Sequence, residues 1–376
     1  MDIKHIYKIK LFEVTGADFN KIIKNFENIA TKDLSQKKLV TKRRLTMSNE
    51  KLRFGVIGTS KITDWFLEGA QHARAFTLTA VYSRSEETAT AFSKKYHVPY
   101  IFTNLKDMAE SDVIDAVYIA SPNALHAEQT ILFLNNKKHV LCEKAFASNS
   151  IEVIKMIATA KRNQVILMEA MKTTLLPNFN VIKDNLHKIG KIRRYFGSYC
   201  QYSSRYDTYK AGIILNAFKL ELSNGSLMDL GVYCIHPMIN LFGKPNELKA
   251  NGVMLESGVD GEGSLLFKYD DMEGIAVFSK IANSILPSEI QGEDGNIIIQ
   301  NINDFERVKI IYKDGTEEDI SQIHIKDNMY YEIYEFINLV KNKDFKTNAH
   351  MLQISKWVME SMDEARKQMG LVFSCD

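Results

Sequence analysis

Short apolar runs alternate with longer amphipathic segments between residue 53 and about residue 170. This alternation predicts βαβ units, in which helices connect the strands of a parallel sheet. The predicted strands are residues 54–57, 78–82, 99–102, 116–120, 140–142 and 165–168, and the predicted helices are residues 62–72, 86–96, 124–135 and 152–162.

The pattern changes in the second half of the chain, where β runs follow one another with turn residues between them. The predicted strands there are residues 192–202, 248–255, 264–268, 275–281, 296–300 and 308–312, and the predicted helices are residues 226–242, 330–340 and 351–369. The predicted fold class is α/β, with an N-terminal Rossmann domain built on a doubly wound parallel sheet and a C-terminal α+β domain with a mostly antiparallel sheet. We expect an extension over residues 1–50, a dinucleotide-binding domain over residues 51–170 and a substrate and oligomerisation domain over residues 171–376.

Composition and charge fit this picture. The 376 residues are 45% hydrophobic and carry a net charge of only +2, which favours a large core and gives no bulk reason to expect a nucleic-acid partner. Residues 1–46 hold 11 Lys/Arg and 5 Asp/Glu, a net of +6, so the remainder carries −4. This segment is either a basic arm for an anionic partner or an appended extension, and the looseness of chain termini favours the second.

Neither a membrane nor a metal is expected. No apolar run approaches the roughly 18 residues that span a bilayer. The four cysteines form no Cys-x-x-Cys pair and none lies at zinc-ligand spacing from a histidine. Reduced thiols in a cytoplasmic protein are therefore the expectation.

A candidate phosphate-binding turn follows the first predicted strand. In a dinucleotide-binding fold, backbone N–H groups of this turn and the next helix receive the pyrophosphate. Ser60 and Thr63 stand where a second glycine and a third small residue are expected, so the turn alone is equally compatible with a ligand-free βα connection. The residues predicted to bind the cofactor here are Gly58, Thr59, Ser60, Lys61 and Ile62.

The end of the second strand indicates which nicotinamide cofactor is used. An acidic residue there would accept hydrogen bonds from the ribose 2′-OH of NAD. Ser83 and Arg84 occupy the position instead, and a hydroxyl with a guanidinium matches a 2′-phosphate. The sequence therefore predicts NADP, with NAD as the alternative should Arg84 be a plain surface charge.

Two further strand ends carry candidate groups at the same edge of the sheet. The predicted contacts to the cofactor there are Ser121, Pro122, Asn123, His126, Glu143 and Lys144. A lysine in this place can polarise a C–O bond and favour an alkoxide during hydride loss. A Glu-Lys pair is otherwise most often a solvated surface pair.

The predicted helix over residues 226–242 places three proton-handling groups on one face. Asp229 and Tyr233 are four residues apart, and His236 follows three residues later. A core histidine is the favoured interpretation of His236 alone, whereas the Asp229 and Tyr233 pair favours function. We expect Lys144, Asp229 and Tyr233 to be catalytic and to contact substrate, with His236 as a further substrate contact.

In this order and spacing, the residues resemble the glucose–fructose oxidoreductase/inositol dehydrogenase (Gfo/Idh/MocA) family over about residues 52–372. The resemblance implies an open-faced sheet in the second domain that often mediates dimers or tetramers, so a homodimer or homotetramer is expected. The matching segments are Phe54-Gly-Val-Ile-Gly58-Thr, Ala120-Ser-Pro-Asn123 with His126, Lys138-His-Val-Leu-Cys-Glu143-Lys144, Met168-Glu169-Ala170 and Asp229-Leu-Gly231-Val-Tyr233.

The resemblance also implies roles for single residues. Lys144 corresponds to the lysine of a Glu-Lys-Pro motif, and Asp229 with the residue four later forms the acid–base pair. Inositol-type members have histidine at that later position, so Tyr233 favours the dihydrodiol and xylose dehydrogenase branch. Ala145 in place of the motif proline, Ser60 in the phosphate turn and Ser226 after a single glycine are departures from the family pattern.

The predicted activity is hydride transfer between the nicotinamide and a secondary hydroxyl or carbonyl of a sugar, polyol or cyclic diol. Tyr233 would take the hydroxyl proton, helped by Lys144, which should lower the pKa of the phenol from about 10. Two alternatives remain, a non-catalytic NADP-binding regulator and an NAD-dependent glycosidase of the same family.

Overall fold

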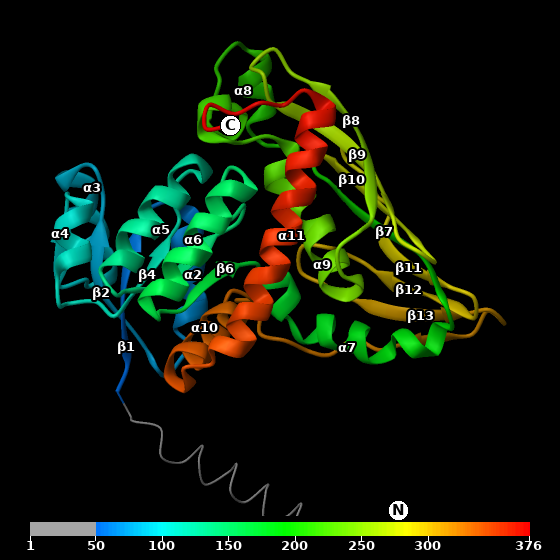
Figure 1. Ribbon diagram of the computed structural model, residues 1–376, viewed down its shortest axis with the longest axis horizontal. Helices are drawn as coiled ribbons and strands as arrows, with labels where there is room; N and C mark the ends of the chain where they lie inside the picture. Colours follow the sequence, from blue (N-terminus) through cyan, green and yellow to red (C-terminus); the bar gives the residue numbers. More distant parts are fainter. Residues whose placement is uncertain (1–49) are drawn as a thin grey trace, which may run out of the picture. The chain divides into compact units, whose positions relative to one another are not determined.

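The computed structural model describes residues 50–376 (Figure 1), so the basic segment over residues 1–46 lies outside the described residues. Six parallel strands form the first sheet, in the order β3-β2-β1-β4-β5-β6. They are β1 (Leu52–Ile57), β2 (Phe76–Tyr82), β3 (Tyr100–Phe102), β4 (Ala116–Ile119), β5 (His139–Glu143) and β6 (Leu167–Ala170).

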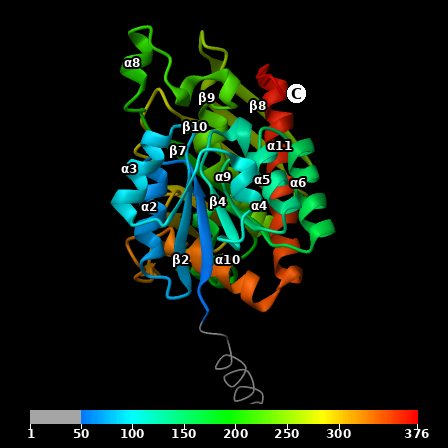
Figure 2. The same cartoon turned by 90° about the vertical axis from the view of Figure 1, so that its left-hand side faces the viewer.

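Helices cover both faces of this sheet, which makes it doubly wound. Figure 2 shows α2 and α3 on one side of the strands and α4, α5 and α6 on the other. The helices are α2 (Lys61–Ala70), α3 (Glu86–Tyr96), α4 (Leu105–Glu110), α5 (His126–Asn135) and α6 (Ser150–Asn163). The strand order reverses between β1 and β4, and ligands of such sheets bind beyond the carboxyl ends of the strands at this point.

One helix from the far end of the chain completes the core of the first sheet. Helix α10 (Tyr330–Asn342) packs on α2, and the ring centroid of Phe336 lies 5.7 Å from that of Phe54 in β1. Gly69 permits the approach, because a Cβ there would lie 2.7 Å from the Tyr330 nitrogen. Burial of each such aromatic side chain stabilises the fold by about 1.5–3 kcal/mol, so α10 belongs energetically with the first sheet.

The second sheet has eight strands in the order β14-β13-β12-β11-β7-β10-β9-β8, of which only β7 and β10 pair in parallel. They are β7 (Ile192–Cys200), β8 (Glu247–Met254), β9 (Asp260–Lys268), β10 (Glu273–Ser279), β11 (Ser288–Gly292), β12 (Gly295–Ile299), β13 (Val308–Tyr312) and β14 (Glu317–Asp319). The fold class predicted from the sequence is thereby confirmed.

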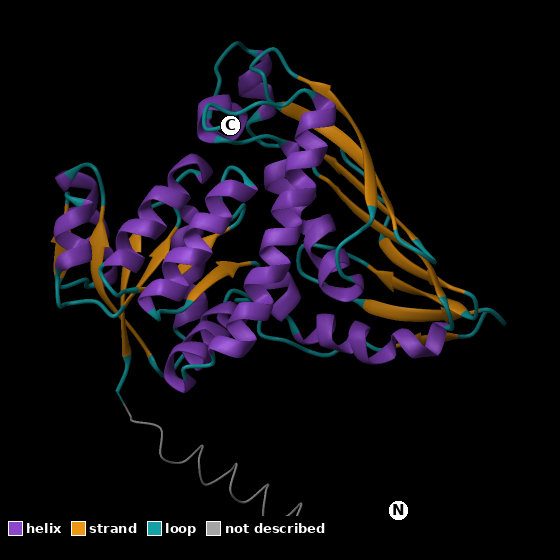
Figure 3. Ribbon diagram, viewed as in Figure 1, coloured by secondary structure: helices purple, strands orange, loops and turns teal. Residues whose placement is uncertain are grey.

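Helices cover one face of this second sheet (Figure 3). They include α9 (Val232–Phe242), which packs on β7 and β10, and α11 (Phe345–Met369), which contacts β8 as well as β6 and α6 of the first sheet. The shorter helices are α7 (Pro177–Asn185) and α8 (Tyr206–Lys210), with single turns at η2 (Asn123–Leu125), η3 (Lys172–Leu175), η4 (Leu186–Ile189), η5 (Asn216–Phe218) and η6 (Leu220–Leu222).

The structure differs from the predicted elements in a few places. Strands β11 and β14 and helices α4 and α7 were not predicted, because short or weakly patterned segments take their structure from their neighbours. The helix predicted over residues 226–242 consists of a π-helical turn, η7 (Leu227–Gly231), followed by α9. π-helical turns are often found at functional sites, and this one carries Asp229.

Candidate active site

Lys144, Asp229 and Tyr233 meet where the two sheets face each other. Lys144 directly follows β5, and the other two residues lie in η7 and in the first turn of α9. The Lys144 Nζ lies 2.7 Å from Asp229 Oδ1 and 3.0 Å from the Asp229 carbonyl oxygen. It also lies 4.9 Å from the centroid of the Tyr233 ring. The structure thus brings together the three residues that the sequence predicted to be catalytic.

A fourth residue of this cluster was not predicted from the sequence. The Lys280 Nζ lies 2.9 Å from Asp229 Oδ2, so the carboxylate bridges two lysines. Lys280 immediately follows β10 and its side chain is only 3% exposed. No sequence motif includes this lysine. Its position at the end of an otherwise apolar β run was the one feature that could have suggested a buried, functional lysine.

The charges of the cluster stabilise one another. Burial alone would raise the pKa of the Asp229 carboxyl, but the adjacent ammonium groups of Lys144 and Lys280 hold it well below its usual value. Burial would likewise lower the pKa of Lys144, but Asp229 beside it keeps that pKa above the usual value. Asp229 is therefore ionised and both of its oxygens are occupied, which suits it for orienting groups and not for accepting a proton.

The expected effect of Lys144 on Tyr233 needs a correction. Lys144 does act to lower the pKa of the Tyr233 phenol, but burial raises it by more, and the net pKa lies above the ordinary value. The ring of Tyr199 in β7 packs edge-on against that of Tyr233, with centroids 5.5 Å apart. At neutral pH Tyr233 is consequently a neutral phenol, able to donate a proton.

Two buried side chains, Glu143 and His126, hydrogen-bond to the turn that carries Lys144. Glu143 accepts a hydrogen bond of 2.6 Å from the Tyr118 hydroxyl and one of 3.2 Å from the Lys144 backbone N–H. His126 is fully buried, with Nδ1 2.9 Å from the Ala145 carbonyl and Nε2 2.8 Å from the Ser121 carbonyl. Both side chains make these contacts within the protein, and their predicted contact with the cofactor stays a prediction.

His236 also points away from the cluster. Its Nε2 lies 3.7 Å from Glu169 Oε2, and both side chains are buried. They line a cavity of about 190 Å³ together with residues of η3 and α11. The sequence placed His236 on the face of Asp229 and Tyr233 from helical spacing alone. Tyr233 and His236 do lie in the same α-helix, α9, but the His236 side chain makes no hydrogen bond or ion pair with Lys144, Asp229 or Tyr233. Its contact with substrate stays a prediction.

The predicted phosphate turn has a backbone conformation that requires glycine at its first position. Gly58 has a φ of +99°, and a Cβ there would lie 2.6 Å from the Ala120 carbonyl oxygen, so glycine is needed. The Thr63 hydroxyl donates to the Gly58 carbonyl at 2.8 Å, which fixes the turn from inside. Ser60 precedes α2 without a side-chain capping bond, so its hydroxyl and the first N–H groups of α2 suit a phosphate. Thr59, Lys61 and Ile62 complete this turn.

The remaining predicted cofactor contacts lie at neighbouring strand ends. Arg84 is exposed and makes no hydrogen bond or ion pair within residues 50–376, while Ser83 Oγ accepts only a long bond from the Ser85 N–H. The Asn123 side chain donates to the Ser223 carbonyl at 2.9 Å and so links η2 to the segment before η7. Ser121 donates to the Gln129 side chain, and Pro122 lies beside it. The free guanidinium and the phosphate turn together fit NADP.

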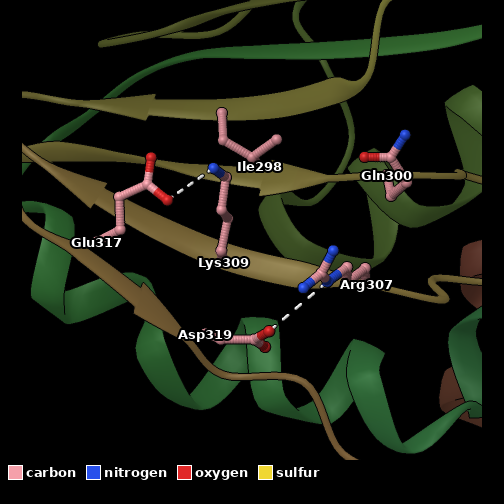
Figure 4. Close-up of a pocket in the computed structure, with 6 residues that line it drawn as sticks. All are labelled: Ile298, Gln300, Arg307, Lys309, Glu317 and Asp319. Carbon is pink, nitrogen blue, oxygen red and sulfur yellow. Dashed lines mark hydrogen bonds and ion pairs between the residues drawn. The ribbon is translucent and has the colours of Figure 1, made fainter.

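A larger cavity elsewhere does not belong to this site. About 510 Å³ in volume, it lies on the outer face of β12–β14, away from the buried side chains of Ile297 and Ile299. Figure 4 shows that its charged groups pair with one another, Lys309 with Glu317 and Arg307 with Asp319.

Comparison with known proteins adds to this geometry. Residues 52–171 match a model described as an oxidoreductase family with an NAD-binding Rossmann fold, and residues 186–298 match the GFO/IDH/MocA C-terminal domain. Bacillus subtilis scyllo-inositol 2-dehydrogenase (NADP(+)) IolU is 55% identical over 325 residues, 86% of this chain and 99% of the relative. The trans-1,2-dihydrobenzene-1,2-diol dehydrogenase of Danio rerio is 29% identical over 86% of this chain and 99% of its own length.

Among solved structures, the 3-ketoreductase KijD10 from Actinomadura kijaniata superposes with a TM-score of 0.72. The match covers 85% of this chain and 98% of that one at 22% identity, and it shows a shared fold.

Proposed function

The chain belongs to the Gfo/Idh/MocA family of nicotinamide-dependent oxidoreductases, and on that premise we propose that it interconverts a cyclic polyol and its ketone with NADP. The observation that carries this proposal is the contact of Lys144 with both Asp229 and Tyr233 at the carboxyl end of β5. An ammonium and a phenol beside each other are the groups that a carbonyl oxygen needs while it gains negative charge and then a proton.

The roles follow from the charges of the cluster. Bound NADP would supply the hydride donor or acceptor. In the reducing direction, the Lys144 ammonium stabilises the developing alkoxide and the neutral Tyr233 phenol delivers the proton. In the oxidising direction, only the ionised phenol can accept the hydroxyl proton. Because the pKa of Tyr233 is raised, the neutral phenol must first lose its own proton to solvent. Asp229 holds Lys144 in place throughout.

The substrate class is inferred from the relatives. An inositol and a dihydrodiol share a six-membered ring with neighbouring secondary hydroxyl groups, and the relatives at 55% and 29% identity are named for them. Tyr233 in place of a histidine favours the diol branch, whereas the higher identity favours an inositol. We propose scyllo-inositol and its ring ketone as the first pair to test.

The test is the initial rate of NADPH formation with scyllo-inositol, myo-inositol, xylose and trans-dihydrodiol, each also assayed with NAD. We expect turnover of a cyclic polyol with NADP, and a loss of about 10³-fold or more in Lys144→Met, since the electrostatic stabilisation is then absent. Lys309→Met, which removes a paired lysine from the outer face, is the control and should keep full activity. NADPH binding without turnover of any polyol would favour the regulator alternative.

The division of labour between the two sheets is part of the same proposal. Residues 51–170 would bind the nucleotide and residues 171–376 would contact substrate and a second copy, with α10 packing on the first sheet. The outer face of β8 and β9, at the opposite end of the second sheet from Lys309 in β13, exposes Val253 and Leu266, which supports a homodimer or homotetramer through those two strands. Light scattering of the purified protein tests this assembly.

The surroundings in which the enzyme works are also proposed. Cys142 and Cys234 are buried and free, which supports a reducing, cytoplasmic environment. Within residues 50–376 no helix is long and apolar enough to cross a membrane.

A further inference from the structure

We infer that Lys280 is a positioning residue of this active site, which fixes the Asp229 carboxylate so that the carboxylate in turn aims Lys144 at the substrate. The inference rests on the proposed function for its consequence in catalysis. Its structural part, a carboxylate clamped by two lysines, stands on the contacts alone.

Three neighbouring groups fix the position of the Lys280 ammonium. Its Nζ donates to Asp229 Oδ2 at 2.9 Å and to the Ala217 carbonyl at 3.1 Å, and it lies 5.3 Å from the centroid of the Phe218 ring. The side chain is 3% exposed, so it cannot exchange these partners for water. A buried ammonium is costly unless it is paired and hydrogen-bonded, and here both conditions are met.

The second lysine changes what Asp229 can do. A carboxyl group turns over a broad range about its last torsion, so one cation on one oxygen fixes it poorly. Here Lys144 occupies Oδ1 and Lys280 occupies Oδ2, although the Asp229 side chain is itself 38% exposed. Two cations on opposite oxygens define the plane of the carboxylate, and Lys144 takes its direction from that plane.

The second lysine also sets the charge of the site. Lys144 and Asp229 alone would be a neutral pair, and Lys280 adds one positive charge to that pair beside Tyr233. That surplus favours an alkoxide on the substrate, because charges interact strongly in a partly buried site. Lys280 therefore contributes both to the orientation of Lys144 and to the electrostatic stabilisation of the alkoxide.

Lys280 further connects the cluster to the segment over residues 205–219, which follows β7 in the chain. Its side chain bonds the Ala217 carbonyl, and its own carbonyl accepts from the Ser203 N–H at 2.9 Å. Ile213 and Ile214 of this segment are exposed. A contact between the segment and a substrate would thus be transmitted to Asp229 through one residue.

The test compares Lys280→Met with Lys280→Arg and with the control Lys309→Met in the full chain. Lys280→Met should lower kcat by roughly ten- to hundredfold with little change in KM or in NADPH affinity, as expected for misdirected catalytic groups. Lys280→Arg keeps the charge and should recover most of that loss, and Lys309→Met should behave as wild type. A Lys280→Met enzyme with wild-type kcat overturns the inference.

A second measurement does not depend on turnover. The cofactor-free protein is labelled with ¹³C at the aspartate carboxyls. The Asp229 signal is identified by its absence in Asp229→Asn, and its chemical shift is then followed by NMR as a function of pH. Removing a cation raises the pKa of a neighbouring carboxyl, so Asp229 should protonate at higher pH in Lys280→Met than in wild type or Lys309→Met. Equal titration in all three proteins overturns the clamp.

The two arms separate the two proposals. A wild-type protein that oxidises no polyol removes the proposed function, while the aspartate titration still decides on Lys280. If Lys280→Met does not fold, Lys280→Gln, which keeps a donor without the charge, replaces it in both arms with the same expected results.

Discussion

The Nδ1 of His126 lies 2.9 Å from the Ala145 carbonyl, and its Nε2 faces the Ser121 carbonyl at 2.8 Å. Burial lowers the pKa of this histidine, so the ring is neutral and donates its one proton to one of the two carbonyls at a time. The histidine thus holds together the two strand-end turns that carry Ser121 and Lys144. Where the family motif has a proline, this chain has Ala145 and a hydrogen bond to a buried imidazole.

We therefore predict that His126→Leu lowers both stability and activity. Losing the donor leaves a buried carbonyl unpaired, which costs about 1–3 kcal/mol of unfolding free energy, measured by urea denaturation. The rate should fall as well, because the Lys144 turn loosens. His72→Ala is the control, since its pair with Asp327 is largely exposed, and it should change the free energy by less than about 1 kcal/mol. Unchanged stability in His126→Leu would refute the role of this bond.

The raised pKa of Tyr233 predicts different pH dependences for the two directions of reaction. Oxidation needs the ionised phenol, so its rate should rise up to about tenfold per pH unit from pH 7 upward. Reduction needs the neutral phenol and should be nearly flat over the same range. Initial rates in both directions between about pH 6 and pH 10 check this.

Tyr233→Phe should abolish the slope of the oxidation profile and leave NADPH affinity unchanged. Tyr330→Phe, on the first-sheet helix α10, serves as the matched control. A flat oxidation profile in wild type would show that another group accepts the proton.

Arg84 should determine the choice between NADP and NAD. It has no ion-pair partner within the described part of the chain, and a charge-assisted bond to a 2′-phosphate contributes about 1.5–3 kcal/mol. Arg84→Ala should therefore weaken NADPH binding by roughly ten- to hundredfold and leave NADH binding nearly unchanged, as measured by fluorescence titration. The exposed Arg74 provides a control in Arg74→Ala. Equal loss for both cofactors would argue against the assignment.

The buried Glu169 predicts a pH-dependent stability. Burial raises its pKa to about 7, next to Ser355 and the neighbouring Glu143. The folded pKa lies above the unfolded value of about 4.5. Below pH 4.5 the carboxyl is protonated in both states and does not destabilise the fold, and the free energy of unfolding falls as pH rises from there towards 7. The loss amounts to roughly 3 kcal/mol.

Glu169→Gln should remove this slope, so the variant gains stability relative to wild type between about pH 5 and pH 8. Urea denaturation at several pH values measures it. The control is Glu110→Gln, at an exposed site on α4, which should leave the slope intact. A wild-type stability that does not fall over this range would contradict the raised pKa.

The periodic apolar runs of the first half were sufficient to predict its strands and all its longer helices, although not the short α4, because parallel strands buried on both faces carry a strong local pattern. The order of Lys144, Asp229 and Tyr233 along the chain was likewise sufficient to select three residues that the fold brings together, and their catalytic roles stay a prediction. These features depend on residue type and spacing, which the sequence contains directly.

Other features depend on which distant segments meet. The contact of Lys280 with Asp229 could not be predicted from the sequence, because it depends on the pairing of β10 with β7 and β9, which places the end of β10 opposite Asp229. His236 lies beside Glu169 of β6, a neighbour that spacing along one helix cannot reveal. Burial outweighed the attraction of Lys144 at Tyr233. The sequence by itself therefore determined the fold class and predicted three candidate reacting residues that lie together, whereas tertiary packing decided their partners and protonation, because desolvation and close charges exist only in the folded chain.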